Sequence, residues 1–417
     1  MRTLYSFLTH ISVFFLWVSG LFNKKMRLFV KGRKKVLDTI AQRIKPEDKT
    51  IWFHCASLGE FEQGLPIMQA IKTSYPQYKL VLTFFSPSGY EIKKNSPVAD
   101  LITYLPLDTR GNAKRFVSLV HPSLAIFVKY EFWPNYLFEL ESSGTPAIIV
   151  SGLFRENQSF FRPYGVFMRK ALRTIDHFFV QNKNSEMLLK GLGIDHVNIS
   201  GDTRFDRVSA QIEQDNSLPF IEAFKGNSIC IVCGSTWPED EAILIPYINA
   251  ASANIKFIVA PHTIEAGKID IFRKKIKGTS ILYSEKDSAD LSAASVLIID
   301  NIGLLTKVYH YADIAYVGGA MGNSGLHNIL EPATFGIPVV IGKNFEKFPE
   351  AKRLQSLAAL FSVSNQEEVF EIMSRLVDDK NFREKTGMIA GHFVNSNTGA
   401  TRVIMEYIAS LHSNGLI

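Results

Sequence analysis

The sequence predicts an α/β protein with two doubly wound halves. Short apolar runs alternate along the chain with stretches of helical spacing, which is the pattern of parallel βαβ units. At 417 residues the chain is too long for one compact core and suits two domains. Its hydrophobic content of 46% and charged content of 21% are typical of a globular protein.

The predicted strands fall into two series, separated by the polar stretch AQIEQDNSLP at 210–219. The first series covers 51–55, 79–85, 101–106, 123–130, 146–152, 177–182 and 197–201, with helical spacing at 61–74, 112–120 and 162–174. The second series covers 228–235, 256–262, 280–284, 296–300, 314–319 and 338–342. We therefore expect an amino-terminal segment at 1–35, a first Rossmann-like domain at 36–207 and a second one at 208–417. Because ligands bind beyond the carboxyl ends of such strands, the active site is expected in a cleft between the two halves.

The amino-terminal segment resembles a membrane anchor. LYSFLTHISVFFLWVSGLF, at 4–22, contains one ionisable group, His10, and is long enough to span a bilayer or lie deep in its interface. KKMRLFVKGRKK, at 24–35, follows with seven Lys or Arg and no acid. The positive-inside rule then places the body of the protein in the cytoplasm, and the basic run would rest on anionic headgroups. An amphipathic or core helix is the alternative, and a basic run directly after an apolar segment does not favour nucleic acid as the partner.

The three cysteines do not predict a disulfide framework or a metal site. Low cysteine usage fits a reducing compartment. Cys230 and Cys233 form a Cys-x-x-Cys, but they lie inside SICIVCGS, an apolar run that we interpret as a buried strand. No second pair or nearby histidine accompanies them, so a place in the core is the expected role.

A glycine-rich stretch, GGAMGNSGLHNILEPATFGIPVVIG at 318–342, follows a predicted strand. Glycines let backbone N–H groups approach a ligand, and a helix predicted from about Gly325 to Phe335 would add a partial positive charge at its start. The loop would therefore suit a phosphate, and Glu331 could accept hydrogen bonds from a ribose diol. A sharp turn that needs glycine only for its backbone conformation is the alternative.

A single acid in WFHCASLGEFEQGLP, at 52–66, has two interpretations. Ser57-x-x-Glu60 matches a capping box, in which Glu60 would cap a helix. Gly59, Gly64 and Pro66 disfavour a helix over this stretch, so the regular helix is predicted to begin nearer Leu65. That would leave Glu60 in a loop at the carboxyl end of a strand, where a catalytic group is expected.

Several motifs together resemble a known family. The ordered set Gly-rich loop, Ser324, Asn328, Glu331, Gly336 and Pro338 is similar to the nucleotide-binding signature of GT-B glycosyltransferases. With HCASLGEFEQGLP, KYEFWPN, SGLFRENQSF, GDTRFD, GSTWPEDE, APH and HNILEPATFGIPVVIG, nearly the whole chain looks like the Kdo transferases, which attach 3-deoxy-D-manno-octulosonic acid to lipid A precursors. The resemblance implies a GT-B enzyme at the cytoplasmic face of the bacterial inner membrane. It also implies a CMP-Kdo donor, a lipid A precursor (lipid IVA) as acceptor, and an inverting mechanism without a metal or cofactor.

The resemblance assigns roles residue by residue. The acid of the family's Ser-x-Gly-Glu stretch is the general base, and the matching position is Glu60. The positions that match the family's donor-binding residues are Pro261, His262, Ile302, Gly303, Leu304, Asn328, Ile329, Leu330 and Glu331. Family members tend to have Met-Gly-Glu where this chain has Ile302-Gly303-Leu304, so a side-chain contact from Leu304 is in doubt.

Further candidates follow from the chemistry of the reaction. Glu131 follows a strand and would hold the acceptor or orient a catalytic partner, or would only form an ion pair. Kdo carries a carboxylate, so Arg155 and Arg204, each just past a strand, are candidates to neutralise it. Three residues of the glycine-rich stretch are candidate contacts to the phosphate or carboxylate: Gly319, Ser324 and His327. His54 is interpreted as a core histidine.

Two other functions stay open at this point. One is a GT-B enzyme that uses a UDP-sugar, as a transferase or an epimerase. The other is a membrane-bound sugar-nucleotide binding protein without catalysis, which the Leu304 departure leaves possible.

Overall fold

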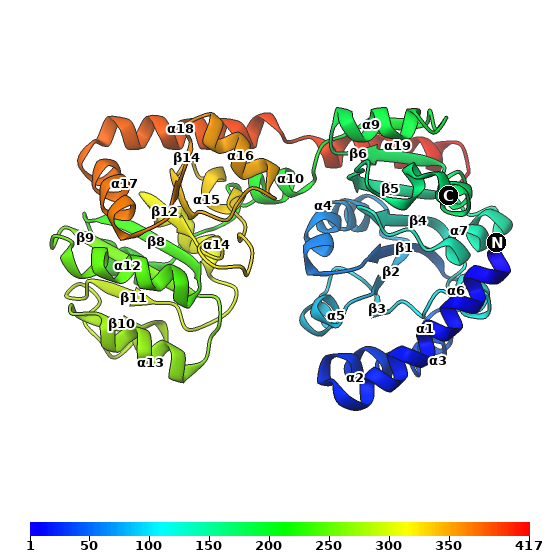
Figure 1. Cartoon of the computed structure of the whole chain (residues 1–417), viewed down its shortest axis with the longest axis horizontal. Helices are drawn as coiled ribbons and strands as arrows, with labels where there is room; N and C mark the ends of the chain where they lie inside the picture. Colours follow the sequence, from blue (N-terminus) through cyan, green and yellow to red (C-terminus); the bar gives the residue numbers. More distant parts are fainter. The chain divides into compact units, whose positions relative to one another are not determined.

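The structure, a computed structural model, describes the backbone of residues 1–417 and all side chains except those of Lys24 and Lys25. The chain forms two compact units (Figure 1), Met1–Arg207 with Thr398–Ile417, and Val208–Asn397. Each unit contains one parallel seven-stranded sheet with helices packed on both of its faces. The predicted α/β class is thereby confirmed.

The first unit runs from helix α1 to strand β7 and is completed by the last helix of the chain. Its strands are β1 (Lys49–Cys55), β2 (Tyr78–Phe84), β3 (Leu101–Tyr104), β4 (Pro122–Val128), β5 (Ala147–Gly152), β6 (His177–Val180) and β7 (Val197–Ile199). Its helices are α1 (Arg2–Phe22), α2 (Lys24–Lys31), α3 (Val36–Arg43), α4 (Leu58–Ser74), α5 (Pro87–Lys93), α6 (Arg110–Val120), α7 (Pro134–Ser143), α8 (Val166–Leu172), α9 (Lys183–Lys190) and α19 (Ala400–Ser413), while α10 (Arg204–Ser209) crosses into the second unit.

The second unit repeats the same arrangement. Its strands are β8 (Ile229–Thr236), β9 (Ile255–Pro261), β10 (Ser280–Leu282), β11 (Val296–Ile298), β12 (Ile314–Val317), β13 (Val339–Gly342) and β14 (Leu360–Val363). Its helices are α11 (Pro219–Lys225), α12 (Pro238–Ala250), α13 (Ala266–Lys275), α14 (Leu305–Val308), α15 (Leu330–Thr334), α16 (Pro349–Ser356), α17 (Gln366–Asp378) and α18 (Lys380–Ser396). Every predicted strand is present, and β14 is an additional one.

The strand order fixes where each sheet can hold a ligand. The order is β3-β2-β1-β4-β5-β6-β7 in the first sheet and β10-β11-β9-β8-β12-β13-β14 in the second. In each sheet the chain starts at a central strand, builds one side, and then crosses to the other side. In such sheets ligands bind at the crossing point, which lies at the carboxyl ends of β1 and β4 in the first unit and of β8 and β12 in the second. We call these two regions the first and the second crevice.

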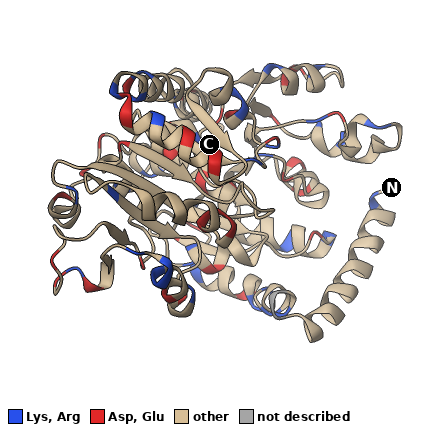
Figure 2. Ribbon diagram, turned by 60° about the vertical axis from the view of Figure 1, so that its left-hand side comes forward, with Lys and Arg blue, Asp and Glu red and all other residues tan. Residues whose placement is uncertain are grey.

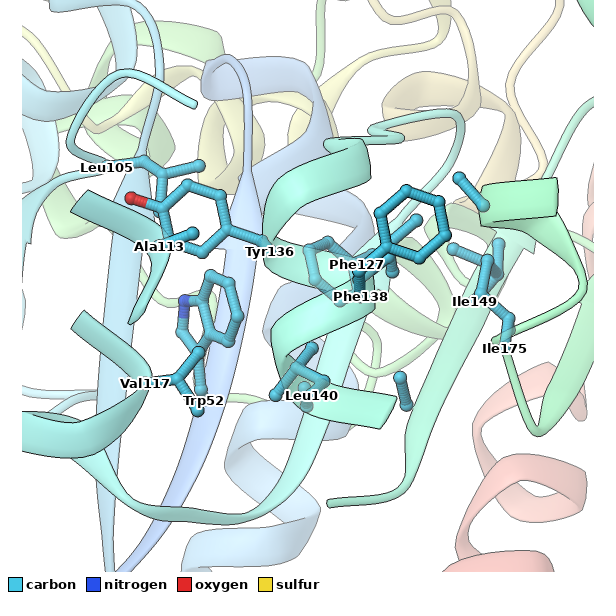
Figure 3. Packing of buried hydrophobic residues seen from close by; sticks show 14 of the residues in the cluster. Trp52, Leu105, Ala113, Val117, Phe127, Tyr136, Phe138, Leu140, Ile149 and Ile175 are labelled. Carbon is cyan, nitrogen blue, oxygen red and sulfur yellow. The ribbon is translucent and has the colours of Figure 1, made fainter. Parts of the chain in front are cut away.

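The central strands are almost completely buried because helices cover both faces of each sheet. In β1, every residue from Thr50 to Cys55 is buried. On one face Trp52 packs against Phe127 of β4, with ring centroids 5.0 Å apart, and against Tyr136 of α7 (Figure 3). These contacts hold β1 and β4, whose ends form the crevice, in one rigid core.

The cysteines are part of these cores. Cys55, Cys230 and Cys233 are fully buried and unpaired. Burial raises the pKa of each thiol above its ordinary value. The interpretation of Cys230 and Cys233 as core residues is confirmed.

Three sequence predictions differ from the structure. Helix α4 begins at Leu58, not near Leu65, and the helix predicted over 325–335 is reduced to α15. Residues 398–417, predicted to be part of the second domain, return to the first unit, where Ile404 and Ile408 of α19 enter the core beside β1 and β2. Asp206 fixes this return, because its carboxylate accepts the backbone N–H groups of Gly399 and Thr401, at 2.5 and 2.6 Å.

Candidate active site

The first crevice brings together two of the predicted acids. Glu60 follows β1 in the first turn of α4, and Glu131 follows β4. They are close enough for the charge of Glu131 to raise the pKa of Glu60. Both candidates therefore lie at one point, at the carboxyl edge of the first sheet.

Glu60 holds the chain just before helix α4, and its pKa is strongly perturbed. Its carboxylate accepts the backbone N–H of Ala56, the residue before the N-cap Ser57, and Phe61 N–H donates to the Ser57 carbonyl at 3.0 Å to close the first turn. Helix α4 therefore starts seven residues earlier than the glycines and proline predicted, without a side-chain cap from Ser57. The side chain is 5% exposed, and burial, followed by repulsion from Glu131, raises its pKa to about 8. An ionised carboxylate has about four acceptor positions, so this hydrogen bond leaves capacity for a substrate hydroxyl.

Glu131 is held by a buried histidine and a tryptophan. Trp133 Nε1–H lies 3.1 Å from Glu131 Oε2 and 3.0 Å from His54 Nε2, and the two acceptors are 3.5 Å apart. An indole N–H can only donate, so His54 accepts at Nε2 and carries its hydrogen on Nδ1, which lies 2.8 Å from Thr83 Oγ1. His54 is fully buried, as a core histidine should be, but it also contacts the Glu131 site. Its place six residues before Glu60, in the same motif, is the one sequence signal that could have suggested this contact.

Three cations lie near one another at this edge of the sheet, and one of them, Lys129, acts on Glu60. Arg155 is exposed, and Arg204 is paired with Asp202, whose Oδ2 lies 2.9 Å from the arginine Nε. Lys129, which the sequence reasoning did not select, has a left-handed backbone (φ +71°) at the end of β4. Burial, followed by repulsion from Arg204, lowers the pKa of Lys129, and attraction to Glu60 opposes this. The positive φ of a lysine is a strained feature typical of functional sites, but no sequence pattern reveals it.

The second crevice is organised by a buried carboxylate. Asp240 of α12 is fully buried and accepts the backbone N–H groups of Trp237 and Gly319, both at 2.9 Å, and the hydroxyl of Tyr316 at 2.8 Å. Gly319 has φ +96°, and a Cβ there would lie 2.1 Å from the Gly325 carbonyl oxygen, so only glycine fits. The amide of Gly319, a candidate phosphate donor, is thus already bound to Asp240, which ties the glycine-rich loop to the start of α12.

Two predicted histidines meet Trp237 at this crevice. The Trp237 ring stacks on His262, with centroids 4.4 Å apart and planes at 18°, and the rings of His262 and His327 are 4.6 Å apart. Trp237 Nε1–H donates to His327 Nε2 at 3.1 Å, which leaves the ring hydrogen of His327 on Nδ1. Burial and the neighbouring His262 lower the pKa of His327 to about 4, and burial lowers that of His262. Both rings are therefore neutral at pH 7, and His327 can offer a neutral N–H donor.

The remaining donor-side candidates lie on two loops, which are joined by hydrogen bonds to Glu331. Glu331 accepts from Asn328 Nδ2 at 3.1 Å and from the Thr306 hydroxyl at 3.2 Å, so the loop before α15 is joined to the start of α14. On the 302–304 loop, Ile302 is 91% exposed and Gly303 has φ +101°, while Leu304 leads into α14.

The other candidates differ in how accessible they are. Ile329 and Leu330 are buried, so a ligand could reach only their backbone, whereas Ser324 is exposed. Pro261 ends β9 and lines a cavity of about 110 Å³ together with Trp237, Glu241 and Lys268. Among the side chains that the structure describes, no cluster of three or more His, Cys, Asp or Glu is arranged to hold a metal ion.

Two Rossmann-like units in one chain, each with polar groups at the crossing point of its sheet, define a GT-B-like fold. A solved structure of UDP-GlcNAc 2-epimerase from Neisseria meningitidis shares this fold, with a TM-score of 0.60 at 14% identity over 87% of this chain and 100% of the other. The family model for 3-deoxy-D-manno-octulosonic-acid transferase (kdotransferase) matches residues 31–207.

Two curated relatives match over most of both chains. The 3-deoxy-D-manno-octulosonic acid transferase of Aquifex aeolicus is 30% identical over 353 residues, which cover 82% of this chain and 91% of the relative. The enzyme of the same name from Chlamydophila psittaci is 28% identical over 371 residues, 85% of each chain. The chain therefore belongs to the 3-deoxy-D-manno-octulosonic acid (Kdo) transferase family, and it is a glycosyltransferase.

Proposed function

We propose that this enzyme transfers Kdo from CMP-Kdo to a lipid A precursor with inversion, and that Glu60 is the general base. The observation that carries the assignment of the base is the group at the first crevice. There, the charges of Glu131 and Lys129 both act on Glu60, and Arg155 and Arg204 lie close enough to act on Lys129. Family membership supports the donor and acceptor.

The state of Glu60 suits proton abstraction from a sugar alcohol. A hydroxyl is a poor nucleophile at neutral pH, so a base that takes its proton during attack accelerates the reaction. A carboxylate with a pKa of about 8 is a stronger base than an ordinary glutamate. Inversion needs only one such base, and Glu131 acts on it electrostatically from the Trp133 and His54 network.

The donor side supplies charge stabilisation to the leaving CMP. The bond from the anomeric carbon breaks as the acceptor oxygen attacks, and its electron pair leaves with the phosphate of CMP. In the proposal His327 donates its Nδ1–H to the phosphate, backbone groups of Gly303 assist, and Asn328 and Glu331 bind the ribose. Pro261, His262, Ile302 and the backbone of 329–330 complete the donor contacts, with Ser324 at the rim. The Kdo carboxylate is neutralised by Lys129, Arg155 or Arg204, and no step of the proposal requires a metal or cofactor.

The amino terminus supports a location at the cytoplasmic face of the inner membrane. Helix α1 is apolar and largely exposed, and the basic residues of 24–35 follow it. A lipid A precursor keeps its acyl chains in the bilayer, so an enzyme held at this surface meets its acceptor there.

A donor-panel assay tests the proposal. Full-length enzyme is mixed with vesicles that contain a tetra-acylated lipid A precursor, and with either CMP-Kdo or UDP-N-acetylglucosamine. Release of CMP together with an acceptor mass increased by Kdo supports the proposal. Release of UDP or epimerisation of the UDP-sugar contradicts the donor, and binding of CMP-Kdo without product would indicate a non-catalytic binding protein.

A further inference from the structure

Helix α1 is long and apolar enough to cross a bilayer, but both of its ends are attached to the first unit. It has 21 residues, a mean hydropathy of 1.5 over its most apolar 18 residues, and no Lys, Arg, Asp or Glu after Arg2, as Figure 2 shows by its almost uncoloured ribbon. At 1.5 Å per residue it is roughly 30 Å long, about the thickness of the hydrocarbon core. A spanning helix would place its two ends on opposite sides of that core.

The start of α1 is bound by polar contacts to the body of the unit. Arg2 donates to Asn135 Oδ1 at 3.2 Å and pairs with Glu139 at 2.7 Å. Tyr5 donates its hydroxyl to Asp108 Oδ2 at 2.8 Å, and Ser6 beside it is 8% exposed. If α1 crossed the membrane while these contacts held, the carboxylates of Asp108 and Glu139 would lie within the hydrocarbon core or across it from the rest of the unit.

The other end is fixed to the same unit by Arg33, just after α2. Its guanidinium donates to the carbonyl oxygens of Phe29, Leu105 and Phe85, at 2.8, 2.8 and 2.6 Å. Phe29 also packs edge-on against Phe85, with ring centroids 5.1 Å apart. In Figure 1, α1 accordingly runs along the first unit from α7 to α2.

The face of α1 that points away from the body is a continuous apolar surface. Its large side chains are one-third to four-fifths exposed: Leu4, Phe7, Leu8, Ile11, Phe14, Phe15, Trp17, Leu21 and Phe22. A patch of this size on a soluble protein marks an interaction site. Helices with such a face and basic flanks lie in the plane of a membrane interface.

Charge at the α1–α2 turn identifies the partner as an anionic lipid surface. A cavity of about 320 Å³ there is lined by Trp17, Gly20, Leu21, Val30 and three cations, Arg27, Lys31 and Lys34. Arg27 donates to the carbonyl oxygens of Gly20 and Leu21 at 3.2 Å, and so caps the end of α1. Among the described side chains, none of the three cations pairs with a carboxylate, so they are free to meet headgroup phosphates.

We propose that the α1–α2 hairpin lies flat in the cytoplasmic leaflet of an anionic phospholipid bilayer, with both ends of α1 on the same side, and does not cross the membrane. The apolar face of α1 enters the acyl boundary, and Lys31 and Lys34 contact the headgroups. The inference concerns attachment only and holds for any donor or acceptor.

Nitroxide depth measurements test the orientation. Labels on Leu4→Cys, Ile11→Cys and Leu21→Cys report three points along the exposed face. The native cysteines are fully buried, so labelling is selective. With full-length enzyme on phosphatidylglycerol vesicles, we expect one shallow depth at positions 4, 11 and 21. A maximum of depth at position 11, or no lipid contact at any of the three positions, overturns the proposal.

Vesicle binding tests the charge. Lys31→Gln with Lys34→Gln removes two cations worth about 1 kcal/mol each at an anionic surface, so binding to phosphatidylglycerol vesicles should weaken about thirtyfold. Binding to phosphatidylcholine vesicles should not change. The matched control, Lys380→Gln with Lys385→Gln on α18, should bind as the wild type does. Equal binding of both double variants to anionic vesicles contradicts the assignment of the partner.

Discussion

The raised pKa of Glu60 predicts how activity depends on pH. If Glu60 must be ionised to accept a proton, kcat/KM follows the ionised fraction of the free enzyme. With a pKa of about 8, roughly one tenth of the molecules are ionised at pH 7 and nine tenths at pH 9. We therefore expect kcat/KM to rise about tenfold between these values, with unit slope at low pH.

The neighbouring charges predict which variants move this profile. Glu131 raises the pKa of Glu60, so Glu131→Gln should shift the rise to lower pH. Lys129 lowers that pKa, so Lys129→Gln should shift the rise to higher pH. Glu141→Gln, at an exposed position on α7, is the matched control and should keep the wild-type midpoint.

The assay is the initial rate of CMP release at low CMP-Kdo concentration, measured from pH 6 to 9.5. Ionisation of the acceptor's own phosphates could also bend the profile, but Glu131→Gln would not move such a bend. A profile that is flat over this range, or a midpoint that neither variant moves, would refute the reasoning.

Three further predictions concern individual contacts. Because the pKa of Glu60 is higher in the folded than in the unfolded protein, its contribution to stability is present below about pH 4.5 and is lost as pH rises toward 8. The free energy of unfolding of Glu60→Gln should therefore rise relative to that of the wild type as pH rises, by at most about 1.4 kcal/mol per pH unit in urea titrations, and a constant difference from pH 5 to 8.5 would contradict the shift. Trp237→Phe keeps the stacking on His262 but removes the hydrogen bond to His327. Imidazole ¹⁵N chemical shifts should then show that His327 leaves the Nδ1–H tautomer, and calorimetry should show weaker binding of CMP. An unchanged tautomer of His327 would contradict the assignment. Asp206→Ala removes the acceptor of the Gly399 and Thr401 N–H groups at the start of α19 and should lower the free energy of unfolding by about 1–2 kcal/mol in urea titration. Asp206→Asn should lower it less. Equal stability of the wild type and both variants would contradict the role of Asp206 in holding α19.

The sheets could be predicted from the sequence because their signal is local. Strands buried on both faces are apolar runs, and thirteen of fourteen were expected in order. The exception, β14, is the edge strand LFSV, whose two middle residues are only half-buried and interrupt the apolar pattern. The return of α19 to the first unit was missed because the contact of Asp206 with Gly399 spans 193 residues, and periodicity does not report such pairs.

The predicted start of α4, near Leu65, was wrong because local propensities were outweighed by contacts in the folded chain. Glycine and proline propensities predict a late helix start, but the hydrogen bond from the Ala56 N–H to the Glu60 carboxylate and the packing of Gly64 beside Val128 and Cys55 outweigh them. In the sequence, the capping and catalytic interpretations of Glu60 were alternatives. In the structure the Glu60 carboxylate accepts the N–H of Ala56, one residue before the N-cap Ser57, and this contact holds the carboxylate at the edge where the base is proposed.

Site residues were predicted where a motif names them and missed where geometry alone selects them. Glu60 and Glu131 are in family motifs and meet at one crevice. Three residues were missed because their roles come from features that a single sequence does not show. Lys129 has a positive φ, Trp237 sets the tautomer of His327, and Asp240 is a buried carboxylate that accepts three hydrogen bonds.

Single-turnover transfer by Glu60→Gln tests the central claim most directly. The variant keeps the shape of the side chain and an acceptor for the Ala56 N–H, but it cannot take a proton. With CMP-Kdo and a tetra-acylated lipid A precursor, mass spectrometry should show Kdo addition by the wild type and at least a hundredfold slower addition by the variant, while both bind CMP equally. Transfer by Glu60→Gln at the wild-type rate would show that another group removes the proton.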